Sequence, residues 1–141
     1  MKPYSFLASM FLLMMIPLMA SAFSSSKGAA KNKKLESPFA CNQNALTQAE
    51  RDRHFKELGP LLRSMKKSVH ELKNGYEFQF ASDEKTFQLV SEWAIQESRC
   101  CPFFRIELRL ESEGGPLWMK LTGREGTKDF IREDAAAWLK Q

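Results

Sequence analysis

The sequence predicts an α+β domain of two layers, in which helices lie on one face of a four-stranded antiparallel sheet. Apolar residues recur at helical spacing in three segments and alternate with polar residues in four others. A hairpin of two strands followed by a helix occurs twice (ββαββα) after an N-terminal helix. A shift of 41 residues also brings Phe78 onto Met119 and Phe80 onto Leu121. We therefore expect two similar hairpin-helix units around one core.

Residues 1–22 have the pattern of a signal peptide. Lys2 supplies the positive charge, an apolar run extends from Phe6 to Ala20, and Ala20-Ser21-Ala22 resembles a cleavage site. An uncleaved anchor helix is the alternative, but about 15 apolar residues are fewer than the roughly 20 that span a bilayer. We expect an exported, periplasmic or extracellular protein without a transmembrane anchor after cleavage.

Residues 23–40 are rich in Ser, Lys, Ala and Gly, which predicts a flexible basic tether before a single domain at 41–141. The net charge of +4 lies in residues 1–40, in Lys2 and in the lysines of the tether, because residues 41–141 hold 16 Lys and Arg against 16 Asp and Glu. A nucleic-acid-binding domain usually presents a basic stripe on its folded face. No such stripe is visible, and nucleic acid is not an expected partner.

The first helix is predicted to begin at a capping box, in which Thr47 and Glu50 bond to each other's backbone amides. Gly59-Pro60 is expected to kink or split this helix. Its apolar residues are Phe55, Leu58, Leu61, Leu62 and Met65.

A hairpin follows, with strands at 69–73 and 76–81 around Asn74-Gly75. This dipeptide predicts a type I′ turn, in which both central residues have positive φ. The second helix is expected to begin at Ser82 or Asp83. Its inward side is predicted to hold Phe87, Val90, Trp93 and Ala94.

The second hairpin begins after Pro102 and turns at Gly114-Gly115. A last helix is predicted to open near 125–127. The apolar strand residues are Phe104, Ile106, Leu108, Leu110, Leu117, Met119 and Leu121, and the last helix buries Phe130, Ile131, Ala135, Trp138 and Leu139.

Two of the three cysteines are adjacent, at Cys100 and Cys101, where the second helical pattern stops. Adjacent Cα atoms lie about 3.8 Å apart, below the roughly 4.4 to 6.8 Å of relaxed disulfides. A low-strain bridge therefore joins Cys41 to either Cys100 or Cys101. It closes a loop of about 60 residues and stabilises the fold by about 4 kcal/mol.

In the alternative state all three thiols are reduced and Cys41, Cys100 and Cys101 form a metal site. Three sulfurs suit a soft ion such as Cu(I), Hg(II) or As(III). Glu97 either lies behind the sulfurs as a hydrogen-bond acceptor or faces water, and we favour water.

Zinc would need a fourth ligand, which His54, His70 or Glu97 could supply, although adjacent cysteines do not match C-x2-C zinc spacing. Both histidines are expected to be ordinary surface or packed residues. A cysteine nucleophile is disfavoured because Cys100 lies at the C-terminal end of its helix, where the dipole destabilises a thiolate.

The chain resembles a group of small bacterial proteins that share an E-x-x-C-C-P-F motif, and this resemblance covers Cys41 to Leu139. It implies that the three cysteines and Glu97 belong to the shared pattern, and it implies no particular activity. The shared features are a cysteine followed by Ala45-Leu46-Thr47, Asn74-Gly75-Tyr76-Glu77-Phe78 with Phe80, Glu97-x-x-Cys100-Cys101-Pro102-Phe103, and Leu121-Thr122-Gly123 with Glu125-Gly126.

Three functional hypotheses remain open from the sequence. The first is an exported protein that binds a soft metal or metalloid ion through its cysteines. The second is a non-catalytic structural or interaction domain stabilised by a Cys41 disulfide. The third and least favoured is a thiol oxidoreductase, and no Ser/His/Asp set, phosphate loop or HExxH motif predicts any other enzyme.

Overall fold

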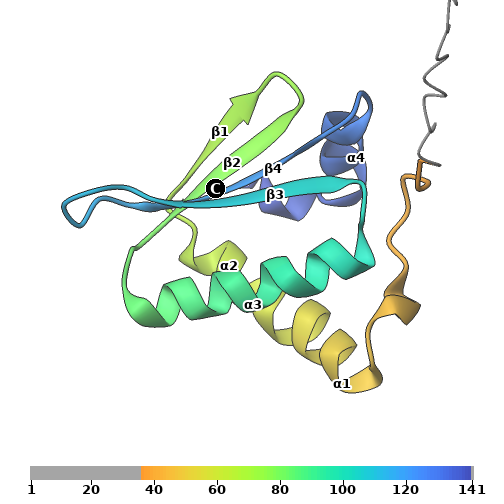
Figure 1. Cartoon of the computed structure of the whole chain (residues 1–141), viewed down its shortest axis with the longest axis horizontal. Helices are drawn as coiled ribbons and strands as arrows, with labels where there is room; N and C mark the ends of the chain where they lie inside the picture. Colours follow the sequence, from red (N-terminus) through yellow and green to blue (C-terminus); the bar gives the residue numbers. More distant parts are fainter. Residues whose placement is uncertain (1–35, 141) are drawn as a thin grey trace, which may run out of the picture. The chain divides into compact units, whose positions relative to one another are not determined.

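The computed structural model describes residues 36–140, so the predicted signal peptide and residues 23–35 of the predicted tether lie outside the described residues (Figure 1). One antiparallel sheet has the order β1-β2-β4-β3, which confirms the predicted α+β class. The strands are β1 (Ser68–Leu72), β2 (Gly75–Phe80), β3 (Phe104–Leu110) and β4 (Leu117–Gly123).

The helices are α1 (Gln48–Arg51), the π-helix η2 (Asp52–Leu58), α2 (Gly59–Met65), α3 (Glu84–Cys100) and α4 (Thr127–Asp134), with 3-10 turns η1 (Gln43–Ala45) and η3 (Ala136–Trp138). The predicted caps of the first two helices are present: Thr47 and Glu50 form the capping box, and Asp83 rather than Ser82 caps α3. None of the helices within residues 36–140 has the length and apolar character needed to cross a bilayer.

The two central strands, β2 and β4, pair symmetrically about Phe78 and Met119, the two positions that a shift of 41 residues superimposes. Each half of the domain therefore contributes its second strand to the centre of the sheet and its first strand to an edge. This register gives the sequence similarity of the two halves a structural counterpart.

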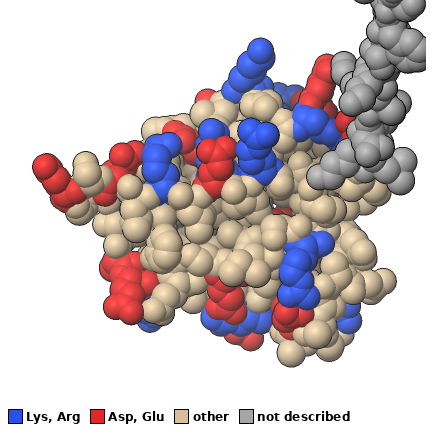
Figure 2. All heavy atoms as spheres, in the orientation of Figure 1, with Lys and Arg blue, Asp and Glu red and all other residues tan. Residues whose placement is uncertain are grey.

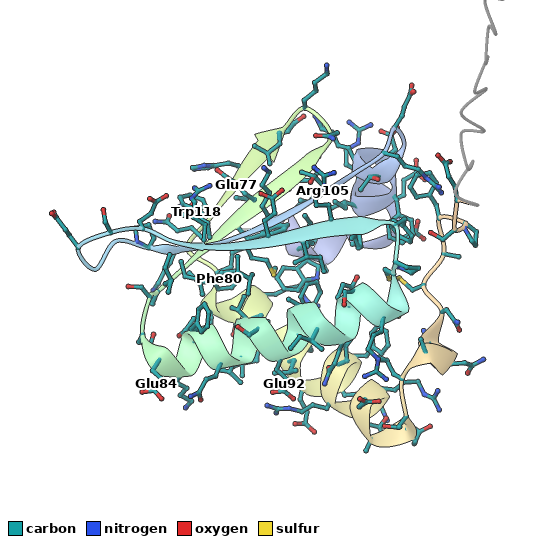
Figure 3. The ribbon with its side chains drawn as sticks, in the orientation of Figure 1. Glu77, Phe80, Glu84, Glu92, Arg105 and Trp118 are labelled. Atoms are coloured by element: carbon teal, nitrogen blue, oxygen red, sulfur yellow. A yellow bond between two sulfur atoms is a disulfide. The ribbon has the colours of Figure 1, made fainter. Side chains whose placement is uncertain are left out.

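The hydrophobic core lies on one face of the sheet, between the strands and the helices. Figure 3 shows Phe80 on the side of α3, whereas Glu77, Arg105 and Trp118 lie on the other side. All helices that pack on the sheet contribute to this one core, as the sequence predicted. Its buried members include Leu62 of α2, Val90 and Trp93 of α3, Ile131 of α4 and Trp138 of η3.

The opposite face of the sheet is polar, and charges of both signs are interspersed on it. Glu77 and Arg109 approach to 3.9 Å, and Lys120 pairs with Glu107 at 3.4 Å. The view in Figure 2 likewise shows acidic and basic side chains mixed, with no large patch of one sign. This face has the cross-strand ion pairs expected of a solvated sheet surface.

The first hairpin forms as predicted, but its turn does not. The turn occupies Lys73 and Asn74, and Gly75 is already the first residue of β2, opposite Leu72. Asn74 and Gly75 lack positive φ, so the predicted type I′ turn is wrong here. The second hairpin instead has two successive residues with positive φ, Glu113 and Gly114.

Gly75 is needed for close packing rather than for turn geometry. A Cβ atom at this position would lie 2.0 Å from the carbonyl oxygen of Leu121 on the neighbouring strand β4. We expect Gly75→Ala to lower the free energy of unfolding by about 2 kcal/mol, because the strand must move to accept the methyl group. Urea denaturation measures this loss. Lys73→Ala, in the same hairpin, is the control, and an equal loss in both variants would contradict the explanation.

At Gly59-Pro60 the N-terminal helix changes type, because the π-helix η2 ends at Leu58 and α2 begins at Gly59. The amide of Gly59 bonds to the carbonyl of His54, an i→i+5 contact that defines the π-helix η2. In a regular α-helix the ring of Pro60 would clash with the carbonyl four residues earlier, and the wider turn relieves this contact. The π segment also changes which side chains face inward, with His54 and Leu58 buried.

The sequence assigned four aromatic or aliphatic side chains to the apolar face that the structure leaves exposed, and one of them is Leu110 at the end of β3, which is 51% exposed. Phe55 and Leu61 are both 40% exposed, because the widened turn η2 shifts the inward stripe onto other residues. Phe87 is 37% exposed, since Thr86 rather than its neighbour lies on the stripe of α3 that continues through Val90 and Trp93.

Candidate functional site

The structure brings all three cysteines together, with the three Sγ atoms within 4.8 Å of one another. Cys41 forms a disulfide with Cys101, and the two Cα atoms lie 4.6 Å apart. Cys100 is a buried free thiol. The sequence left the partner of Cys41 open. The position of Cys101 decides it, because this residue follows the last residue of α3 and has non-helical φ and ψ before Pro102.

Polar contacts hold the segment around Cys41 against the end of α3. The amide of Asn42 donates to the carbonyl of Cys100 at 2.7 Å. Arg99 binds Glu50 at 2.7 Å and also donates to the carbonyl of Ala45. The hydrogen bonds from Arg99 and then Thr47 lower the pKa of Glu50 to about 2. These contacts position the first cysteine independently of its covalent bond.

An apolar cluster surrounds the sulfurs: Leu46 and Phe103 pack with Cys100 and Cys101, and Phe130 packs against them. Phe39 lies edge-on to Phe103 with ring centroids 5.2 Å apart. Both Cys100 and Cys101 are fully buried, whereas Cys41 is half-buried. The cluster therefore has one sulfur toward solvent and two away from it.

Burial raises the pKa of the Cys100 thiol to about 11, and the nearby charge of Glu97 adds to this effect. The C-terminal end of α3 acts in the same direction, because its partial negative charge disfavours a thiolate. Cys100 is consequently a neutral thiol at pH 7 and a poor nucleophile without a metal ion.

This raised pKa predicts a loss of stability at alkaline pH. The folded state holds the Cys100 proton more tightly than the unfolded state, so its stabilising effect is complete below pH 9 and is lost as the pH rises toward about 11. We expect the free energy of unfolding to fall over this range in the wild type and to fall less in Cys100→Ser. Urea denaturation at several pH values tests this, and parallel curves for the two proteins would contradict it.

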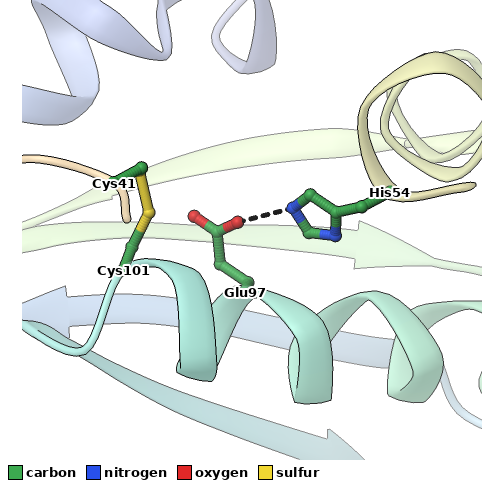
Figure 4. The surroundings of a disulfide bond; sticks show 4 residues. All are labelled: Cys41, His54, Glu97 and Cys101. Carbon is green, nitrogen blue, oxygen red and sulfur yellow. Dashed lines mark hydrogen bonds and ion pairs between the residues drawn. A yellow bond between two sulfur atoms is a disulfide. The ribbon is translucent and has the colours of Figure 1, made fainter. Parts of the chain in front are cut away.

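Glu97 does not face water, and the interpretation that favoured water is wrong. Its carboxylate accepts a hydrogen bond from Nε2 of His54, which lies 2.8 Å from the Glu97 oxygen, and Glu97 and His54 are 7% and 2% exposed. His54 Nδ1 lies 3.2 Å from Oε1 of Gln96. The imidazole stacks on Trp93 with ring centroids 5.3 Å apart. Figure 4 shows Glu97 between His54 and the Cys41–Cys101 disulfide.

The histidine expected to be ordinary is therefore part of a buried polar pair, and this was missed from the sequence. Two signals point to it in retrospect. Glu97 continues the inward stripe of α3 from Val90 and Trp93 to Cys100, at helical spacing. His54 precedes Leu58 by four residues on the inward side of η2. His70, in contrast, lies on the far face of the sheet beside Glu77 and Trp118.

A cleft of about 530 Å³ connects the disulfide with this pair. Cys41, His54 and Glu97 line it, while Cys100 and Cys101 do not. Arg63 and Asp134 contribute charged groups to its wall. The apolar part of the wall includes Phe39, Phe55, Trp93, Phe130 and Trp138.

Comparison of the chain with protein-family models, with curated proteins and with solved structures finds no match. The resemblance to proteins with an E-x-x-C-C-P-F motif thus depends on the motifs and stays a prediction. The candidate site consists of the cysteine cluster, the buried histidine–glutamate pair and the cleft that Cys41 and this pair line.

Proposed function

We propose that the protein is an exported binding protein for a thiophilic ion, and that the reduced thiols of Cys41, Cys100 and Cys101 are the ligands. The observation that carries this proposal is the convergence of three Sγ atoms within 4.8 Å, although one cysteine is 60 residues distant in sequence. An ion bonded to three sulfurs in trigonal-planar geometry, at about 2.3 Å each, holds the sulfurs about 4 Å from one another. The cluster therefore needs only small movements once its bridge is reduced.

The donor set favours Cu(I), Hg(II) or As(III) over zinc. Three thiolates without oxygen ligands match soft ions. Zinc would require a fourth ligand. His54 lines the cleft beside Cys41, but its two ring nitrogens are already within hydrogen-bonding distance of Glu97 and Gln96. Glu97 stays outside the ligand set and keeps its contact with the histidine.

Export is part of the proposal and depends on the signal-peptide pattern of residues 1–22. A disulfide between Cys41 and Cys101 suits an oxidising compartment. In such a compartment the bridged form is the resting state, and the ion binds after two electrons reduce the bridge. Fractionation of cells that express the full chain, followed by mass measurement of the mature N-terminus, tests this part.

Ion binding is tested by titration of the fully reduced protein, without oxygen, with Cu(I), Hg(II) or arsenite. We expect one equivalent to bind for at least one of these ions, with a sulfur-to-metal charge-transfer band for Cu(I) or Hg(II). Cys100→Ser removes one ligand and is expected to weaken binding by more than about 100-fold, since even an outer hydrogen-bonding partner contributes about 10- to 100-fold.

The matched control for this experiment is Ser98→Ala, because Ser98 lies on the exposed side of α3 and its hydroxyl, within residues 36–140, donates only to the carbonyl of Ile95. It should bind like the wild type. Equal affinity of Cys100→Ser and wild type would show that Cys100 is no ligand, and the three-sulfur site would be wrong.

The second candidate is a structural domain, and the bridge itself favours it. Cys41–Cys101 fastens the segment before α1 to the end of α3, and Cys100 is buried in the apolar cluster. Under this alternative the reduced protein takes up no ion with useful affinity. A thiol oxidoreductase fits less well, because a Cys100 pKa of about 11 leaves too little thiolate for nucleophilic attack at neutral pH.

A further inference from the structure

The cleft beside the disulfide has features of a ligand site that the ion-binding proposal does not use. Its volume of about 530 Å³ lies within the range of small-molecule pockets. Aromatic side chains form much of its wall, and besides Glu97, which is paired with His54, the charged residues Arg63 and Asp134 line it. Only one of the three sulfur-bearing residues, Cys41, lines it.

The burial of the sulfurs makes the two ends of the disulfide unequal. Cys41 is half-buried and lines the cleft, whereas Cys101 is fully buried and does not. A nucleophile that enters the cleft therefore reaches the sulfur of Cys41, and the sulfur of Cys101 is the leaving group. The free thiol Cys100 is fully buried and does not line the cleft, so a nucleophile in the cleft does not meet it.

The charged groups of the cleft indicate what kind of molecule would bind. Among residues 36–140, neither Arg63 nor Asp134 has an oppositely charged side chain within 4.0 Å. Arg63 lies over the ring of Trp138 at 5.8 Å and is half-buried. A guanidinium group suits a carboxylate and a carboxylate side chain suits an ammonium group, so the pair matches a zwitterion.

We propose that this cleft binds a small thiol of the amino-acid type, which carries a carboxylate and an ammonium group, and that this thiol reduces the Cys41–Cys101 bridge. In the first step the thiol sulfur bonds to Cys41 Sγ as the Cys41–Cys101 bond breaks, and the thiol proton ends on Cys101. A second thiol molecule attacks the mixed disulfide, releases Cys41 as a thiol and leaves as the oxidised dimer. Reduction frees the ligands of the proposed ion site, so this inference adds regulation of that site.

The experiment measures the rate of bridge opening in the folded protein by mass spectrometry after quenching. Four thiols are compared at equal thiolate concentration: cysteine, cysteamine, 3-mercaptopropionate and 2-mercaptoethanol. We expect the rate with cysteine to be highest and to saturate with concentration, whereas the rate with 2-mercaptoethanol rises linearly. Saturation reports binding before reaction.

Two variants test which charged group of the cleft binds which end of the thiol. Arg63→Met should slow the reaction of cysteine and 3-mercaptopropionate by about fivefold and leave cysteamine unchanged. Asp134→Asn should slow cysteine and cysteamine and leave 3-mercaptopropionate unchanged. The control is Arg132→Met, because Arg132 is an exposed residue of α4 that pairs with Asp129 and does not line the cleft.

A third variant tests the cleft itself. Ala137 is exposed and lines the cleft, so Ala137→Trp should fill its mouth and slow all four thiols by about tenfold without a change in melting temperature. A linear, unsaturated rate for cysteine together with charge-independent rates in Arg63→Met and Asp134→Asn would overturn the proposal. Ion uptake by protein reduced beforehand with a phosphine is measured separately, so failure of this inference is distinct from failure of the ion site.

Discussion

Reduction of the Cys41–Cys101 bridge is expected to lower the free energy of unfolding by about 4 kcal/mol. The bridge closes a loop of 60 residues, and in the chain-entropy view the stabilisation grows with the length of the loop that is closed. This loss is a large part of the total stability of a domain of this size. Urea denaturation of the oxidised protein and of the double variant Cys41→Ser/Cys101→Ser measures it.

The control is Cys100→Ser, which keeps the bridge and alters only the buried thiol. It should lose much less stability than the double variant. The amide of Asn42 and the side chain of Arg99 still hold the N-terminal segment without the bridge, so the double variant should remain folded in water. Equal losses in the two proteins would mean that the bridge does not restrict the unfolded chain as proposed.

Replacement of His54 by Leu is expected to cost about 3 kcal/mol, the second large effect. Both members of the His54–Glu97 pair are buried, and removal of one partner leaves the other polar group without compensation. Gln96 also loses its partner at Nδ1. Thermal and urea denaturation of His54→Leu give the size of the loss.

The double variant His54→Leu/Glu97→Met distinguishes the pair from simple packing. It removes both polar groups together and should recover much of the lost stability, because no uncompensated group remains. Glu97→Met alone should be destabilised through the unpaired imidazole. Additive losses in the two single variants and the double variant would show that the contact between His54 and Glu97 contributes nothing.

Much of the fold could be predicted because its signals are local. Alternation in the strands, the capping box at Thr47 and the cap at Asp83 all depend on residues a few positions apart. The errors occur where contacts between distant segments decide. The position of Gly75 follows from the carbonyl of Leu121 on a strand that is not adjacent in sequence.

The candidate site could be predicted only in part, for the same reason. Adjacent cysteines at the end of a helix exclude a relaxed bridge between themselves, so Cys41 is the partner by elimination. The choice of Cys101 over Cys100 depends on how the chain leaves α3 at Pro102. The role of His54 depends on the π-helix, and neither helical periodicity nor capping rules predict that widened turn.

The central claim is that Cys41, Cys100 and Cys101 bind one ion together. X-ray absorption spectroscopy of the reduced protein loaded with one equivalent of Hg(II), Cu(I) or arsenite tests it most directly. The account predicts three sulfur neighbours at a single short distance from the ion and the loss of one of them in Cys100→Ser. A first coordination sphere of two sulfurs, or one completed by nitrogen or oxygen, that stays unchanged in Cys100→Ser would contradict the account.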